Sequence, residues 1–172
     1  MLLFFRYQQS HLILILVNIW LLLIKLQTLK KNSYLRVDGL TLKWWLNTNK
    51  ELLTNLLNQG SVSIEELLEN FHAWLEELKE DGGEIYFWGN GILFDNKMIQ
   101  YQFEENGLDY PIYYKNDRDV RTIVDLTCAK LGMSEKELKE ELNDDLLVKH
   151  NALDDVKYQI KLVTKCYEVL ID

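Results

Sequence analysis

The chain has 172 residues, of which 48% are hydrophobic and 27% charged, and this size and composition fit one globular domain with its own core. With a single proline and no Ser/Gly-rich tract, a long disordered segment or an interdomain linker is excluded. The net charge of −8 divides into +6 over residues 1–50 and −14 over residues 51–172, which excludes a broad basic nucleic-acid-binding surface but not the binding of a phosphate through metal ions.

An apolar run of thirteen residues, Leu12 to Ile24, is interrupted only by Asn18. The run is shorter than the ~20 residues needed to cross a bilayer, and no small-residue cleavage site follows it. We favour fully buried strands here, with a membrane anchor and a segment foreign to the fold as the alternatives. Cys128 and Cys166 form no CxxC pair and no zinc-like spacing, so we expect free thiols and a cytoplasmic location.

From residue 40 the spacing of apolar residues becomes helical. Residues 40–60 predict helix that closes on Gly60, and Ser63 with Glu66 forms a capping box that opens a second helix before the stop at residues 81–83. The apolar face of that second helix consists of Ile64, Leu67, Leu68, Phe71, Trp74, Leu75 and Leu78, and its glutamates form a solvated face. Residues 84–90, EIYFWGN, predict a buried strand.

The remaining elements are mostly helical. Residues 96–105 predict a helix that ends at Asn106-Gly107, YPIYY (110–114) a short strand, and residues 117–133 a helix. The expected core face of that last helix is Val120, Ile123, Val124, Thr127 and Leu131. Ser134 and Glu137 form another capping box. The final helix, 151–172, carries an apolar stripe of Ala152, Val156, Ile160, Val163, Tyr167 and Leu170.

Two stretches carry residues that could do chemistry. WGNGILFD (88–95) reads most simply as a strand entering an Asn-Gly turn, with Asp95 at the start of a helix. In HNALDDV (150–156), Asn151 is a natural N-cap and Asp154 falls at N3, where its charge suits the helix dipole. This explanation leaves His150 just outside the helix and Asp155 rotated by ~100° from Asp154. A functional pair and simple capping chemistry are both compatible with the stretch.

Taken together, four landmarks in chain order resemble the DEDDh 3′–5′ exonucleases, the RNase T-like superfamily, and most of all the branch of phage exonuclease A and related bacterial exoribonucleases. The landmarks are TLKWW (41–45), WGNGILFD (88–95), RDVRT (118–122) and HNALDD (150–155). The resemblance covers residues 35–172, after an atypical apolar and basic segment at residues 1–34. It implies an α/β fold, a ribonuclease H-like mixed sheet flanked by helices, with N-terminal strands that are atypical or incomplete.

The resemblance also implies a chemistry and a set of residues. The enzymes cut a phosphodiester bond with two Mg²⁺ or Mn²⁺ ions, and hard ions require carboxylate oxygens. Asp95 and Asp155 would bind metal, and His150 would be the general base. The implied substrate-binding residues are Asn90, Phe94 and Arg121. We expect Trp44 and Trp45 to belong to the core rather than to stack on bases.

The implied substrates are 3′ ends of single-stranded RNA or DNA, and the products are nucleoside monophosphates. A homodimer is compatible with the resemblance, and we expect no membrane partner.

One part of the family pattern is missing. Its first strand carries an Asp-x-Glu pair, whereas Asp38 is the single acid before Glu51 and HLILILV (11–17) stands where that strand should be. Three explanations are open: a start further upstream, a frameshift in the first segment, or a true pseudo-exonuclease. The abrupt change in composition near residue 35 favours the first two. We therefore expect an impaired exonuclease, with an inactive nucleic-acid-binding or regulatory domain, membrane-tethered or not, as the alternative.

Overall fold

The structure is a computed structural model that describes residues 5–7, 10–12, 15–16, 38–59, 62–80, 85–143, 147–148 and 150–171. The expected helix stops at Gly60 and at residues 81–83 lie outside the described residues. So do the side chains of residues 12–24, which leaves the burial of the apolar run untested.

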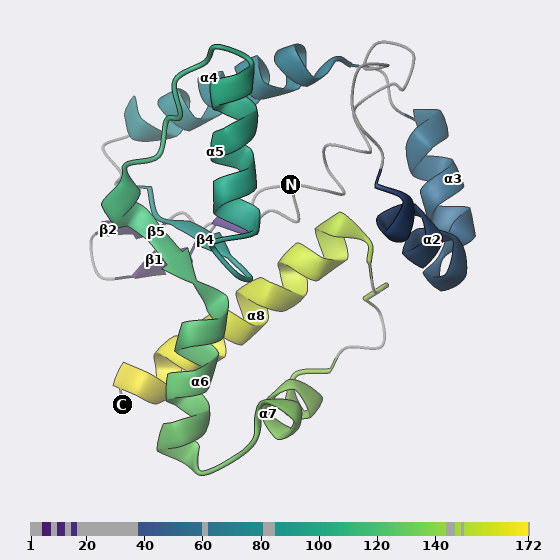
Figure 1. The fold of residues 1–172 in the computed structure, drawn as a ribbon. Coiled ribbons are helices and arrows are strands. Elements are labelled where there is room, and N and C mark those ends of the chain that lie inside the picture. The colour runs from purple at the N-terminus through teal and green to yellow at the C-terminus, as the bar shows by residue number, and fades with distance from the viewer. Residues whose placement is uncertain are drawn as a thin grey trace.

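A small parallel sheet forms the centre of the fold (Figure 1). Strand β3 (Ile15–Leu16) pairs with β4 (Phe87–Gly89), and β4 pairs with β5 (Asp117–Asp119). Strands β1 (Phe5–Tyr7) and β2 (Ser10–Leu12) form a separate antiparallel pair. A helix separates β4 from β5, as parallel neighbours require, so this mostly helical fold with a small parallel sheet is compatible with the α/β class expected from the sequence.

The helices follow the expected order. They are α2 (Gly39–Thr48), α3 (Lys50–Gln59), α4 (Ile64–Glu80), α5 (Asp95–Glu105), α6 (Val120–Leu131), α7 (Glu135–Glu141) and α8 (Ala152–Ile171), with a 3₁₀ turn, η1, at Tyr114–Asn116. Among the described residues, no helix is both long and apolar enough to cross a membrane.

Strand β4 separates two hydrophobic cores. Phe87, 1% exposed, packs with α4 and α5 on one side, where the whole predicted apolar face of α4 is found. Trp88, 3% exposed, packs with α6, α7 and α8 on the other side. Adjacent residues of a strand point to opposite faces, so this strand can join both cores. Figure 1 shows α4 and α5 on one side of β4 and α6 and α8 on the other.

The segment from residue 40 to residue 59 forms two helices rather than one. Asn49 lies between them in a non-helical conformation, and its amide N–H donates to the carbonyl of Trp45, which closes α2. Its side chain then accepts a bond from the amide of Leu52 at 2.9 Å, which caps α3. Apolar periodicity alone does not detect this break, because Asn49 satisfies backbone groups of both helices.

The short strand predicted at YPIYY is wrong, since Tyr113 precedes the 3₁₀ turn and the strand follows that turn. The actual strand, Asp117–Asp119, is polar and has no strand-like alternation. Partners from other elements hold it in place: Asn116 donates to the carbonyl of Ile85 at 2.9 Å, and the guanidinium of Arg118 lies 4.4 Å from the ring centre of Tyr86.

The capping predictions agree with the structure. Ser134 and Glu137 make both bonds of a capping box, and the hydroxyl of Ser63 accepts from the amide of Glu66. On α6 the expected core face is correct except for Leu131, which is 45% exposed at the last turn before Gly132, while Cys128 is buried instead.

Candidate functional site

The turn after β4 explains why the strand runs into Asn-Gly. The amide of Asn90 donates to a carboxylate oxygen of Asp95 at 2.7 Å, and the amides of Phe94 and Asp95 both donate to the carbonyl of Gly91. Gly91 has φ +116°, and a Cβ at this position would meet the guanidinium carbon of Arg121 at 3.4 Å. The turn therefore brings Asn90, Asp95 and Arg121 into one group at the carboxyl end of β4, which is where ligands bind in open parallel sheets.

Asn96, which the sequence analysis did not single out, locks this turn to the sheet. Its side chain is 3% exposed and donates to the carbonyl of Phe87 at 3.1 Å and to Asp117 at 2.7 Å. A Cβ at Gly89 would lie 2.2 Å from the Asn96 side-chain oxygen and 3.1 Å from the Cβ of Asp95. Glycine is therefore required at residue 89 for α5 to begin so close to β4.

Burial raises the pKa of the Asp95 carboxyl, and the negative charge of Asp119 adds to this. The amide of Asn90 and the positive charge of Arg121 act in the opposite direction and lower the pKa. Asp119 ends β5 opposite Gly89, and one of its carboxylate oxygens is buried without a hydrogen-bond partner among the described residues. Sequence reasoning missed Asp119, which it had placed inside a helix. The sequence signal that could have identified Asp119 is its position within RDVRT, directly before the helix that begins at Val120.

Phe94 lies at the rim of this group. The residue is 59% exposed and Leu93, beside it, is 88% exposed. Phe94, which the resemblance implies as a substrate-binding residue, is thus exposed directly before α5.

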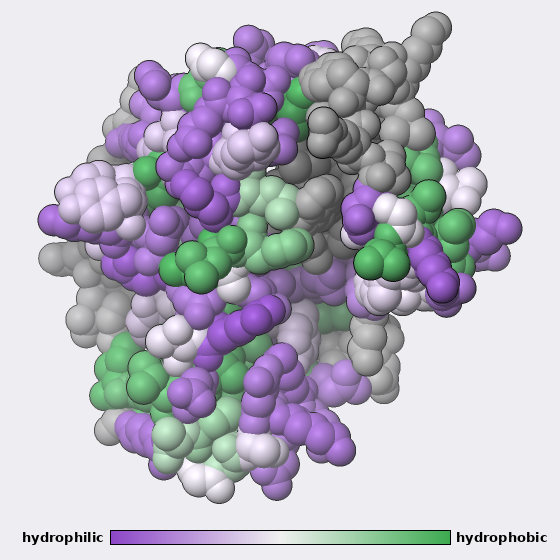
Figure 2. Space-filling view, viewed as in Figure 1, coloured by the Kyte–Doolittle hydropathy of each residue, from purple (hydrophilic) through white to green (hydrophobic). Residues whose placement is uncertain are grey.

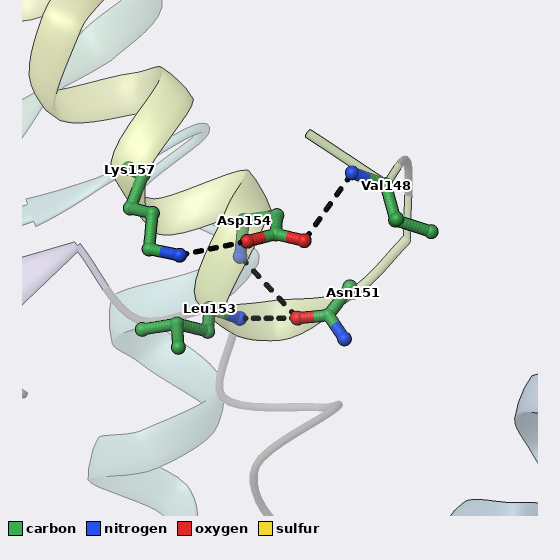
Figure 3. A network of polar contacts seen from close by, with 5 residues as sticks. All are labelled: Val148, Asn151, Leu153, Asp154 and Lys157. Atoms are coloured by element: carbon green, nitrogen blue, oxygen red, sulfur yellow. Dashed lines mark hydrogen bonds and ion pairs between the residues drawn. The ribbon is translucent and has the colours of Figure 1, made fainter. Parts of the chain in front are cut away.

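The amino terminus of α8 carries the second group. The side-chain oxygen of Asn151 accepts from the amides of Leu153 at 3.1 Å and Asp154 at 3.3 Å, as an N-cap should (Figure 3). Asp154 accepts from the amide of Val148 at 3.2 Å and from Lys157 at 2.9 Å. These bonds lower the pKa of Asp154. The predicted capping roles of Asn151 and Asp154 are confirmed.

His150 and Asp155 come together beside this cap. His150 has φ +67°, a left-handed conformation that is rare outside glycine, and its amide donates to a carboxylate oxygen of Asp155 at 3.2 Å. Both residues line a pocket between α7 and the start of α8, together with residues that include Glu135, Lys139 and Tyr158. His150 and Asp155 are therefore neighbours, joined by a hydrogen bond from the backbone amide of His150.

Strand β3 contacts the two elements that lead into the two groups. It pairs with β4, whose end carries the first group, and packs against α8, whose start carries the second. The β3 residues are Ile15 and Leu16, so the strand itself has no carboxylate. Within the part of the chain that the structure describes, no three His, Cys, Asp or Glu side chains lie close enough together to bind a metal ion.

Replacing Asp95 by Asn tests the electrostatics of the first group. Since burial raises the pKa of Asp95 above its ordinary value of 3.8, folding is favoured by this group below pH 3.8, and that contribution is lost as the pH rises through the raised value. Asp95→Asn keeps an acceptor for the Asn90 amide and should raise the free energy of unfolding at pH 7 by about 1 kcal/mol. Thermal denaturation at pH 7 and pH 4 should show this gain shrinking at the lower pH. A variant less stable than the parent at pH 7 would contradict the assignment.

The second group predicts a contrast between two neighbours. Asn151→Ala removes the acceptor of two amides and should lower the free energy of unfolding by about 1 kcal/mol. Asp154→Asn keeps an oxygen for the Val148 amide and loses only the charge that faces Lys157, so its cost should be smaller. Urea denaturation of both variants gives the comparison, and an equal or larger loss for Asp154→Asn would show that the cap is misassigned.

Comparison with known proteins gives one match. The model of the 3′-5′ exoribonuclease Rv2179c-like domain family matches residues 22–167. No curated protein and no solved structure matches the chain. The matched stretch contains both groups of the candidate site, and the chain belongs to the 3′-5′ exoribonuclease Rv2179c-like domain family.

Proposed function

We propose that the chain is a DEDDh-type exonuclease domain that takes the 3′ end of single-stranded RNA or DNA and releases nucleoside monophosphates. One observation carries the proposal: β3 lies next to both the strand that delivers Asp95 and the helix that delivers Asp155 and His150. The family membership supports the reaction, and parallel strands with helices on both faces are compatible with a ribonuclease H-like sheet.

The first group suits the terminal nucleotide. Arg121, exposed beside Asp95, supplies a positive charge for a phosphate, and its planar guanidinium can donate two parallel hydrogen bonds to phosphate oxygens. Phe94 offers an exposed ring to the terminal base or sugar. Asn90, whose backbone is fixed by Asp95, keeps its side chain at an exposed position of the same turn.

The second group suits proton transfer. His150 is the proposed general base, because histidine changes its charge near neutral pH and this one lines a pocket. It would accept the proton of the attacking water. Asp155 accepts a hydrogen bond from the backbone amide of His150, and it lines the same pocket.

We include Mg²⁺ or Mn²⁺ in the proposal as the ion of the family chemistry, with Asp95 and Asp155 as its ligands here. These two carboxylates are too few, because such ions take most of their ligands as oxygens from several residues. We therefore propose that the chain is impaired as written. The competing function is a domain that binds nucleic acid ends without cutting them, and the incomplete donor set is the observation that favours it.

Binding of a 3′ end separates both functions from a domain with no nucleic-acid role. Arg121→Ala should weaken the affinity for a short single-stranded RNA by about three- to tenfold, because it removes a phosphate contact. Lys43→Ala, which removes an exposed cation on α2, is the matched control and should change the affinity little. Fluorescence anisotropy with a 5′-labelled oligonucleotide measures this. Equal losses for the two variants would mean that Arg121 is not at the binding site.

Hydrolysis separates the enzyme from the binding domain. The chain as given should trim a 5′-labelled RNA very slowly in Mn²⁺, and a chimera whose first strand carries Asp-x-Glu should trim it from the 3′ end. In that chimera, Asp155→Asn and His150→Ala should each lower the rate by about a hundredfold or more, while Asp154→Asn should leave it nearly unchanged. A chimera that binds RNA without trimming it would favour the binding domain. Equal sensitivity at Asp154 and Asp155 would place the site on the wrong residues.

A further inference from the structure

The imidazole of His150 packs against two tryptophan side chains, those of Trp44 and Trp45. The ring centroids of His150 and Trp44 are 5.2 Å apart at an interplanar angle of 88°, and those of His150 and Trp45 are 6.3 Å apart at 73°. The two indoles contact each other in the same way, at 5.2 Å and 81°. All three contacts have the edge-to-face geometry that aromatic rings favour.

The two tryptophans differ in how they are held. Trp45 is 8% exposed and forms, with Leu53, the small core of the α2–α3 hairpin. Trp44 is 47% exposed and rests on Trp45 and His150. The prediction that both belong to a core is therefore right for Trp45 and wrong for Trp44. Leu40, Leu42 and Leu46 of the same helix are also exposed, and Figure 2 shows hydrophobic residues on the surface of this hairpin.

Among the described residues, the ring contacts of the His150 imidazole are those with Trp44 and Trp45. The amide of His150 is bonded to Asp155, but among the described residues neither ring nitrogen has a hydrogen-bond partner. A catalytic histidine is commonly oriented by a hydrogen bond to one of its nitrogens. Here packing against two indoles restricts the plane of the ring of His150, which also lines the pocket.

We propose that Trp44 and Trp45 are positioning residues for His150, and that the α2–α3 hairpin serves to hold this imidazole over the pocket between α7 and α8. Trp45 is held in the core of the hairpin, and Trp44 packs against both Trp45 and the imidazole. The inference rests on the proposed role of His150. It adds Trp44 and Trp45 to the site, and these residues are neither carboxylate ligands nor part of the helix cap.

Nuclear magnetic resonance of the full chain with ring-labelled histidine tests this directly. The chain has three histidines, and His150→Gln identifies the resonance of His150. In the parent, we expect nuclear Overhauser contacts between the His150 ring and indole protons, and ring-proton shifts displaced from those of free histidine. Trp44→Leu should remove the contacts to Trp44 and move the shifts toward free histidine, and Trp44→Phe should retain most of the displacement because it keeps an aromatic ring.

Leu46→Ala is the matched control, since Leu46 lies on the same helix and is also 47% exposed. It should leave the His150 resonances unchanged, and the methyl signals of buried Val163 should report an intact main core in every variant. If Trp44→Leu leaves the His150 resonances where they are, the positioning role is overturned. The readout does not depend on hydrolysis: a shift in Trp44→Leu without RNA trimming by any form of the chain would support the positioning and refute only the proposed function.

Discussion

The burial of strand β4 between two cores is the constraint on which the rest of the structure depends. Phe87 and Trp88 point to opposite sides, so this strand of three residues joins the α4–α5 layer to the α6–α8 layer. Because the strand is buried on both faces, its backbone bonds must be satisfied by neighbouring strands, and β3 and β5 supply them. The chain then has to leave the sheet abruptly, which is why Gly89 and Gly91 flank Asn90.

This abrupt exit determines the chemistry of the first group. With Asn96 bonded to Phe87 and Asp117, α5 begins directly beside the sheet, and Asp95 is held in a partly buried position next to Asp119 and Arg121. Burial and the negative charge of Asp119 raise the cost of ionising Asp95, whereas the Asn90 amide and the guanidinium of Arg121 lower it. The second group is held differently, through helix capping and aromatic packing.

How far the sequence predicted this depends on whether a feature is local. Capping at Ser134 and Asn151, the apolar face of α4 and the helix start at Asp95 depend on neighbours within one turn, and sequence patterns record such neighbours. The break at Asn49, the polar strand at Asp117–Asp119 and the bonds of Asn96 depend on partners far away in the chain. The contact of Trp44 with His150 could not be predicted either, because the two residues are remote in sequence. Of the candidate site, sequence patterns singled out Asn90, Asp95, His150 and Asp155 but missed Asn96 and Asp119.

We propose that the residues at the end of β4 and at the start of α8 bind one nucleotide together, although separate contacts hold them in place. Amide chemical-shift mapping with a nucleoside 5′-monophosphate, the product of the proposed reaction, tests it most directly because it needs no catalysis. We predict concerted shifts at Asn90, Asp95 and Arg121 and at His150 and Asp155, with one apparent dissociation constant. Shifts confined to one group, or two groups that saturate at different concentrations, would contradict a single site.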